Sequence, residues 1–228
     1  PFIEFLIMYN VSIIGASGYT GAQLVQLVHQ HPALSLEGTY VSENSADAGK
    51  NIAALHGNLA HLNYTLTPIS NDILVELATE MDFVLLATPH EASHDWMETL
   101  SAGKAKILDL SGAFRIKDTQ VFEQFYGFPH TATTSLKKAI YGLAEWYEDD
   151  IAQADIIAVP GCYPTASLSA LKPLAASGLL DDAVRPVINA VSGVSGAGRK
   201  ASLTSSFYEV SLQAYGVLGH RHTPEIEA

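Results

Sequence analysis

The chain has 228 residues, a length that suits one and a half to two domains of ordinary size. Hydrophobic residues make up 48% and charged residues 16%, and with a mean hydropathy of +0.16 this balance excludes a disordered or fibrous chain. Twelve basic residues against 24 acidic ones give a net charge of -12, which argues against nucleic acid or membrane partners. A single cysteine excludes an internal disulfide, so we expect a reducing, cytoplasmic compartment.

The first predicted elements form a strand, helix and strand unit. A β-branched run over Tyr9–Ile14 predicts a strand, and apolar periodicity over Ala22–Gln30 predicts a helix. The run Leu34–Val41 predicts a second strand, with a right-handed crossover from the first. A glycine-rich turn links the first strand to the helix.

Further along, mostly apolar strands are expected at Phe83–Ala87, Lys106–Leu110 and Asp155–Val159, with a helix over Glu91–Ala102. This alternation predicts an α/β fold with a doubly wound parallel sheet of the Rossmann type. The segment Ser111–Ala139 is rich in aromatic and turn residues, and we expect an irregular surface excursion there.

The sequence changes character after Cys162. A helix is expected over Thr165–Ala176, a strand over Arg185–Val191 and a glycine- and serine-rich loop over Ser192–Lys200. We therefore predict a nucleotide-binding domain over residues 1–161 and the start of an α+β catalytic and dimerisation domain over residues 162–228.

Three glycines, Gly15, Gly18 and Gly21, follow the first strand with the spacing G-x-x-G-x-x-G. At a strand-to-helix junction such glycines let backbone amides approach a pyrophosphate, although a tight turn alone would also need glycine. The predicted dinucleotide-binding residues of this turn are Gly15, Ser17, Gly18, Tyr19, Thr20 and Gly21.

The end of the second strand bears on the choice between NAD and NADP. Ser42, Ser45 and Lys50 favour the 2′-phosphate of NADP, whereas Glu43 would repel it if it pointed inward. Thr88 and Pro89 follow another strand, at the edge where open parallel sheets bind ligands, and are expected to line the cofactor cleft.

Cys162 lies where a strand should end and a helix begin. The positive end of a helix dipole favours the thiolate, which is the nucleophilic form of cysteine. The alternative is a buried cysteine that acts as a small hydrophobic residue. His220 and His222 are separated by one residue, so an extended segment would direct both side chains to one face. Two histidines without a third ligand nearby are a weak case for a metal, and none is predicted.

Five ordered segments closely resemble the N-acetyl-gamma-glutamyl-phosphate reductase family, within the aspartate-semialdehyde dehydrogenase-like superfamily. They are G-A-S-G-Y-T-G (15–21), D-L-S-G-A-F-R (109–115), P-G-C-Y-P-T (160–165), S-G-V-S-G-A-G-R-K (192–200) and H-R-H-T-P-E-I (220–226). The resemblance implies NADPH-dependent reduction of N-acetylglutamyl 5-phosphate to the 5-semialdehyde, with release of phosphate, in arginine biosynthesis.

In this chemistry Cys162 would form a thioester, which accepts hydride far more readily than a carboxylate does. The sequence leaves open which histidine is the base, with a preference for His220. The predicted anion-binding residues are Arg115, Ser192, Arg199 and Lys200, and the resemblance brings Ser195, Gly196 and Gly198 to the nicotinamide. Members of the family continue beyond the histidine segment, so we expect an incomplete second domain, and the family implies a homo-oligomer.

Three other functions stay open from sequence alone. A reductase of the aspartate-semialdehyde dehydrogenase type would use the same cysteine chemistry on aspartyl phosphate. A non-catalytic module would bind NADP without a reactive cysteine. A cysteine hydrolase would have no need of the glycine turn after the first strand.

Overall fold

The computed structural model describes residues 7–181 and 183–228. Its centre is a seven-stranded sheet with the order β3-β2-β1-β4-β5-β7-β6, in which every neighbouring pair is parallel. The strands are β1 (Tyr9–Ile14), β2 (Leu34–Val41), β3 (Leu66–Pro68), β4 (Phe83–Leu86), β5 (Lys106–Asp109), β6 (Ile140–Tyr141) and β7 (Ile156–Ala158). The predicted parallel sheet of the Rossmann type is confirmed.

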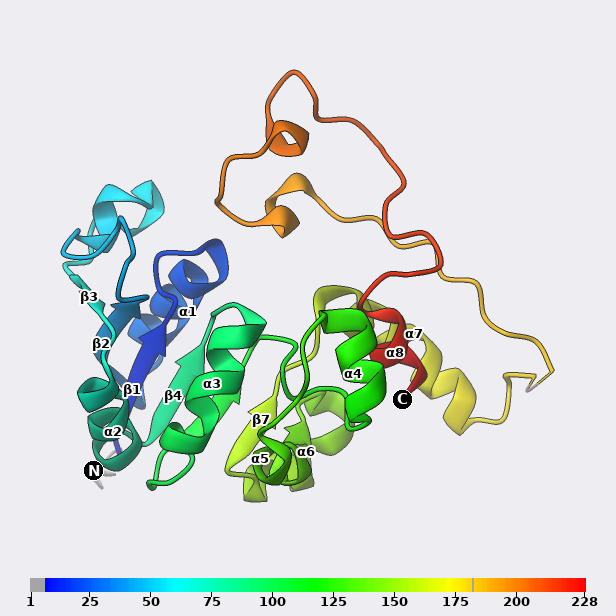
Figure 1. Ribbon diagram of the computed structural model, residues 1–228, viewed down its shortest axis with the longest axis horizontal. Helices are drawn as coiled ribbons and strands as arrows, with labels where there is room; N and C mark the ends of the chain where they lie inside the picture. Colours follow the sequence, from blue (N-terminus) through cyan, green and yellow to red (C-terminus); the bar gives the residue numbers. More distant parts are fainter. Residues whose placement is uncertain (1–6, 182) are drawn as a thin grey trace, which may run out of the picture.

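Helices connect the strands, as parallel pairing requires. They are α1 (Tyr19–Gln30), α2 (Asn71–Glu80), α3 (His90–Leu100), α4 (Thr119–Tyr126), α5 (Thr133–Lys138), α6 (Ala144–Gln153), α7 (Cys162–Ala176) and α8 (Thr223–Glu227). Short 3₁₀ turns are η1 (Ile52–Ala54), η2 (Gly57–Leu59), η3 (Val194–Ala197) and η4 (Leu203–Ser205). Figure 1 shows α1 to α6 around the sheet, whereas η3 and η4 lie in a loop that stands away from it.

Alternating side chains of the central strands supply two separate cores. From β4, Leu86 packs with residues of α2 and α3, while Leu85 packs with residues of α1. Because successive side chains of a strand point to opposite faces, both faces of the sheet are covered. The strand order reverses between β1 and β4, and the carboxyl end of such a switch point is where open parallel sheets bind ligands.

The prediction of an irregular surface excursion over Ser111–Ala139 is wrong. This segment contains α4 and α5, and Phe114 and Phe122 are buried in it. The rings of Phe122 and Tyr126 stack with centroids 4.7 Å apart, and His130 lies edge-on to Phe122. The aromatic residues that suggested irregularity therefore form a core of their own.

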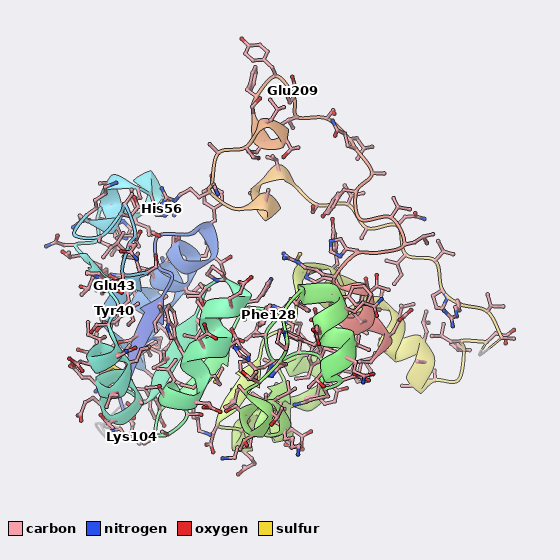
Figure 2. The ribbon with its side chains drawn as sticks, in the orientation of Figure 1. Tyr40, Glu43, His56, Lys104, Phe128 and Glu209 are labelled. Atoms are coloured by element: carbon pink, nitrogen blue, oxygen red, sulfur yellow. The ribbon has the colours of Figure 1, made fainter. Side chains whose placement is uncertain are left out.

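The predicted strand over Arg185–Val191 is also wrong. No described residue of this segment pairs with the sheet, and Val187 and Val191 are 86% and 79% exposed. A β-branched run forms a strand only where an edge is available to pair with it, and here the chain instead continues into a long excursion over residues 183–218. Figure 1 shows this excursion standing away from the sheet, and Glu209 lies at its outer end in Figure 2.

Besides α4 and α5, five helices and strands were not anticipated: β3, α2, β6, α6 and α8. The division of the chain at residues 161 and 162 falls between β7 and α7 and stays a prediction. The described part of residues 162–228 contains α7, η3, η4 and α8.

Two glycines of the turn after β1 are expected to differ in how much they contribute to stability. Gly15 has a φ of 88°, and a Cβ placed there would lie 2.2 Å from the Ala87 carbonyl oxygen, whereas a Cβ on Gly18 would meet only an ordinary contact at 3.5 Å. Strained backbone of this kind costs about 1–3 kcal/mol. Gly15→Ala should therefore lower the melting temperature by several degrees, with about 2–4 °C expected per kcal/mol, and Gly18→Ala should leave it near wild type. Equal melting temperatures for the two variants would contradict this structure of the turn.

Candidate active site

The turns that follow β1, β4, β5 and β7 lie along one edge of the sheet, because parallel strands end at the same side. The glycine turn follows β1, Thr88 and Pro89 follow β4, and Cys162 comes shortly after β7. A Cβ on Gly15 would lie 3.3 Å from the Thr88 methyl carbon, so the turns after β1 and β4 are in contact. The predicted cleft-lining residues thus adjoin one another at the switch point.

The glycine turn presents unpaired backbone donors. The start of α1 has no side-chain cap, and among the described residues the N–H groups of Tyr19, Thr20 and Gly21 have no acceptor. Gly21 cannot carry a side chain, since its Cβ would lie 2.2 Å from the Gly15 oxygen, but Gly18 has room for one. Glycine at position 18 is therefore not required for packing, and it leaves these donors open to an anionic ligand.

Two neighbouring groups shape this turn. The Ser17 carbonyl lies 2.9 Å from Nε2 of His56, a residue between η1 and η2 that is labelled in Figure 2. On the other side, the Thr88 hydroxyl lies 2.7 Å from that of Ser93, and Pro89 caps α3. His56 therefore holds the turn by a hydrogen bond on one side, and the turn after β4 packs against Gly15 on the other.

At the end of β2, the polar residues gather around Asp47. Ser45 accepts a hydrogen bond from the Asp47 N–H at 3.2 Å, Lys50 forms an ion pair with Asp47 at 2.9 Å, and Arg199 forms a second one. The hydrogen bond from Lys50, with that from Arg199, holds the pKa of Asp47 below its usual range against the effect of burial. Ser42 and Glu43 are exposed beside this cluster.

The ion pair between Arg199 and Asp47 bears on the anion-binding predictions. Arg199 belongs to the long excursion, and in this structure its guanidinium contacts the loop after β2. Lys200, Ser195, Gly196 and Gly198 belong to the same excursion, and no hydrogen bond joins them to the Cys162 turn among the residues that the structure describes. Their proposed contacts with substrate and nicotinamide stay predictions.

Cys162 is the first residue of α7, and its side chain is exposed. Gly161 is the N-cap residue, with extended backbone at φ -69° and ψ 164°. Its carbonyl accepts from the N–H of Thr165 at 2.9 Å and from the Thr165 hydroxyl at 2.8 Å. The alternative that Cys162 is a buried small hydrophobic residue therefore does not describe this structure.

Arg115 is buried beneath this turn, and its guanidinium donates inward. Nε donates to the Val159 carbonyl at 2.7 Å, one terminal nitrogen donates to the Leu110 carbonyl at 2.7 Å, and the other lies 3.3 Å from the Glu225 carboxylate. The ion pair joins residues 110 positions apart, with both side chains at least 95% buried. Arg115 thus lies in the cluster, with three of its donor contacts made to protein atoms.

His222 packs directly against the cysteine turn. A Cβ on Gly161 would lie 2.7 Å from Nε2 of His222 and 2.8 Å from the Arg115 guanidinium, so glycine leaves space for both groups. Burial, followed by the nearby charge of Arg115, lowers the pKa of His222 to about 4. Its imidazole is therefore neutral at pH 7, and its Nδ1 is buried without a hydrogen-bond partner among the described residues.

His220 lies beside His222, with ring centroids 4.9 Å apart. Its Nδ1 accepts the His222 N–H at 3.2 Å, and burial lowers its pKa. Tyr163 packs edge-on against the His220 ring at 5.1 Å and donates its hydroxyl to Ser192 at 3.0 Å. The structure thus brings both histidines, Ser192 and the residue after Cys162 together.

Several residues of the cluster were not assigned a role from sequence. Glu225 and Arg221 stand inside the H-R-H-T-P-E-I segment, and Asp109 begins the D-L-S-G-A-F-R segment, so these two segments were the available signal. Tyr141 donates to Glu225 at 2.9 Å, and burial with the neighbouring carboxylate raises the pKa of its hydroxyl. Asp109 is fully buried at the end of β5, where desolvation raises its pKa while it accepts from Ser111.

The described residues include no group of three or more side chains suited to a metal ion. Within the same residues, no helix has both the length and the apolar character that crossing a membrane requires.

The sequence profile described as the NAD binding domain of semialdehyde dehydrogenase matches residues 10–154, well over half of the chain. The chain belongs to the semialdehyde dehydrogenase family. The profile described as the dimerisation domain of semialdehyde dehydrogenase matches residues 162–228.

Two curated relatives share most of this sequence. An N-acetyl-gamma-glutamyl-phosphate reductase of Alteromonas mediterranea is 81% identical over 97% of the chain, and one of Pseudoalteromonas atlantica is 63% identical over 97%. The chain spans 66% and 65% of the lengths of these relatives. Among solved structures, aspartate semialdehyde dehydrogenase II of Vibrio cholerae has a TM-score of 0.52 at 20% identity, over 75% of this chain and 47% of its own, which supports the fold alone.

His90 provides a test of the site's electrostatics. Its Nδ1 accepts the Gly112 N–H at 2.7 Å, its Nε2 lies 3.1 Å from Arg221, and burial lowers its pKa to about 4. The unfolded chain then binds more protons than the folded one between pH 6.5 and pH 4, so the stability contributed above pH 6.5 is lost as the pH falls. His90→Asn keeps an acceptor near the position of Nδ1, and its melting temperature should fall less than that of wild type between pH 7 and pH 5.

The matched control for this experiment is His61→Asn, which replaces an exposed histidine. Thermal melts of the three proteins at both pH values would measure the effect. An equal loss of melting temperature in wild type and His90→Asn would contradict the assigned environment of His90.

Proposed function

We propose that this chain carries out the NADPH-dependent reductive dephosphorylation of N-acetyl-L-glutamyl 5-phosphate to N-acetyl-L-glutamate 5-semialdehyde, a step of arginine biosynthesis. The observation that carries the proposal is the exposed Cys162 thiol at the start of α7, beside His222 and on the sheet edge that also bears the open glycine turn. Relatives that share 81% and 63% of the sequence carry the name of this activity.

The residues of the glycine turn fit the pyrophosphate of NADPH. The unpaired N–H groups at the start of α1 and the space in front of Gly18 suit an anion that approaches the backbone closely. Ser42, Ser45 and Lys50 are proposed to meet the 2′-phosphate, and Thr88 and Pro89 to line the cleft. When bound, NADPH supplies the hydride that a thioester carbon accepts.

Cys162 acts as the nucleophile. Its thiolate attacks the acyl carbon, the bond from that carbon to the phosphate oxygen breaks, and inorganic phosphate leaves with the bonding electrons. The resulting thioester is reduced to a thiohemiacetal, whose C–S bond then breaks to release the aldehyde and regenerate the thiolate. A start-of-helix position stabilises that thiolate in both steps.

The two histidines are proposed to divide the remaining tasks. The Nε2 atom of His222 faces the turn that carries Cys162, and this position favours His222 as the base that takes the thiol proton. His220 already accepts the His222 N–H at Nδ1, which leaves Nε2 as its donor toward the substrate. The contacts thus favour His222 over the preference for His220 that the sequence suggested.

An anionic substrate needs positive groups in a chain with a net charge of -12. Arg115, Ser192, Arg199 and Lys200 are proposed to bind the phosphate and carboxylate groups. For Arg199 this requires release from Asp47, its partner in this structure. Arg221 joins this set, since no described carboxylate forms an ion pair with it and it lies between the two histidines in sequence.

The proposal extends to the setting of the enzyme. We place it in the cytoplasm as a homo-oligomer, with its small-molecule substrate and inorganic phosphate as partners and with no nucleic acid or membrane partner. The match of residues 162–228 to the dimerisation domain profile supports the homo-oligomer. The net charge of -12 supports the exclusion of nucleic acid and anionic membranes.

The reverse reaction tests the proposal. The chain should form NADPH, seen by its absorbance, from NADP, inorganic phosphate and N-acetylglutamate semialdehyde. Cys162→Ser should lower the rate by about 10³-fold or more, because the covalent nucleophile is removed. Omission of phosphate should stop turnover, and aspartate semialdehyde should react more slowly.

The Alteromonas mediterranea relative serves as the control for the assay itself. If that relative reacts and this chain binds NADP without turnover, the chain is a nucleotide-binding module and the proposed activity is wrong. If aspartate semialdehyde is the better substrate, the substrate assignment is wrong.

A further inference from the structure

Glu225 is a buried carboxylate that contacts three separate parts of the sheet edge. It is 4% exposed, and it receives the N–H of Gly161 at 2.8 Å and the hydroxyl of Tyr141 at 2.9 Å on one oxygen. Its other oxygen lies 3.3 Å from Arg115. The partners come from the turn after β7, from β6 and from the loop after β5, so one side chain ties these three together.

The contact with Gly161 fixes the backbone that leads into Cys162. Glu225 holds the N–H of Gly161, while Thr165 donates twice to the Gly161 carbonyl. The N-cap residue of α7 is a glycine, so no side-chain hydrogen bond caps this helix. Glu225 orients the first turn of α7 instead, from a position 64 residues away in sequence. The direction in which the Cys162 thiol points depends on this turn.

Glu225 also fixes the histidine. It lies three residues after His222, in α8, and His222 is the N-cap residue of that helix, its carbonyl accepting the Ile226 N–H at 3.1 Å. A contact that secures Glu225 against Gly161 therefore sets where His222 lies relative to the same turn. The Arg115 guanidinium also takes part, since it pairs with the Glu225 carboxylate and packs against Gly161.

We propose that Glu225 is a positioning residue that sets the separation between Cys162 and His222 by holding the Gly161 N–H, Tyr141 and Arg115 on one carboxylate. The inference rests on the proposed function of Cys162 as nucleophile and His222 as its base. A carboxylate suits the place because all three neighbours are donors, whereas the amide of glutamine would direct an N–H group at one of them.

Alkylation of Cys162 measures this arrangement without substrate or cofactor. Cys162 is the only cysteine of the chain, so the rate of reaction with iodoacetamide reports on it alone. With Glu225 present, His222→Ala should slow alkylation at pH 7 by about tenfold or more, since the base that removes the thiol proton is gone. With Glu225→Ala present, adding His222→Ala should change the rate less than about twofold, because the two groups are no longer held together.

The control is the same substitution at Glu227, an exposed glutamate of α8. Glu227→Ala should leave the tenfold effect of His222→Ala intact. Melting temperatures of all variants are measured alongside, and if Glu225→Ala does not fold, Glu225→Gln takes its place, because it keeps the side-chain length and loses the pairing with Arg115. In that variant the effect of His222→Ala should fall to about threefold or less.

The outcomes separate the two proposals. An unchanged effect of His222→Ala in folded Glu225 variants would overturn the positioning role and leave the proposed function standing, since a merely structural glutamate would lower the melting temperature alone. No effect of His222→Ala even with Glu225 intact would overturn the pairing of Cys162 with His222, and the positioning role with it.

Discussion

The buried ion pair between Arg115 and Glu225 holds the candidate active site together. Removing one partner of such a pair costs about 3–5 kcal/mol, because it leaves the other charge buried and uncompensated. Here the pair joins the loop after β5 to the last helix and, through Gly161, to the cysteine turn. Arg115 and Glu225 are 110 residues apart in sequence. Their ion pair brings the segments that carry Cys162 and His222 together, so the positions of both residues depend on this pair.

The sequence predicted five of the seven strands, because local patterns determine them, and missed the short strands β3 and β6. β1 and β2 have the predicted bounds, and the turns between strands and helices carry their own glycine and proline signals. The segments Ser111–Ala139 and Arg185–Val191 could not be predicted in this way. In the first, aromatic residues of the segment pack against one another in a core of their own, and in the second a β-branched run finds no strand to pair with.

The candidate site shows the same division between local and long-range information. Cys162 at the start of a helix and the glycines after β1 follow from local sequence, and the structure has both features where they were expected. The partners of the charged residues do not follow from local sequence. Arg115 pairs with Glu225 and Arg199 with Asp47, which lies 152 residues away, so a basic residue after a glycine turn could be identified while its contacts could not.

The most direct test of the account is the intact mass of the chain after incubation with N-acetylglutamate semialdehyde and NADP in the absence of phosphate. Without phosphate to release it, the thioester should accumulate, and the mass should increase by one N-acetylglutamyl group on Cys162. Hydroxylamine should remove the group, and Cys162→Ser should not acquire it. An unmodified Cys162 under conditions in which added phosphate allows NADPH formation would contradict covalent catalysis at this residue.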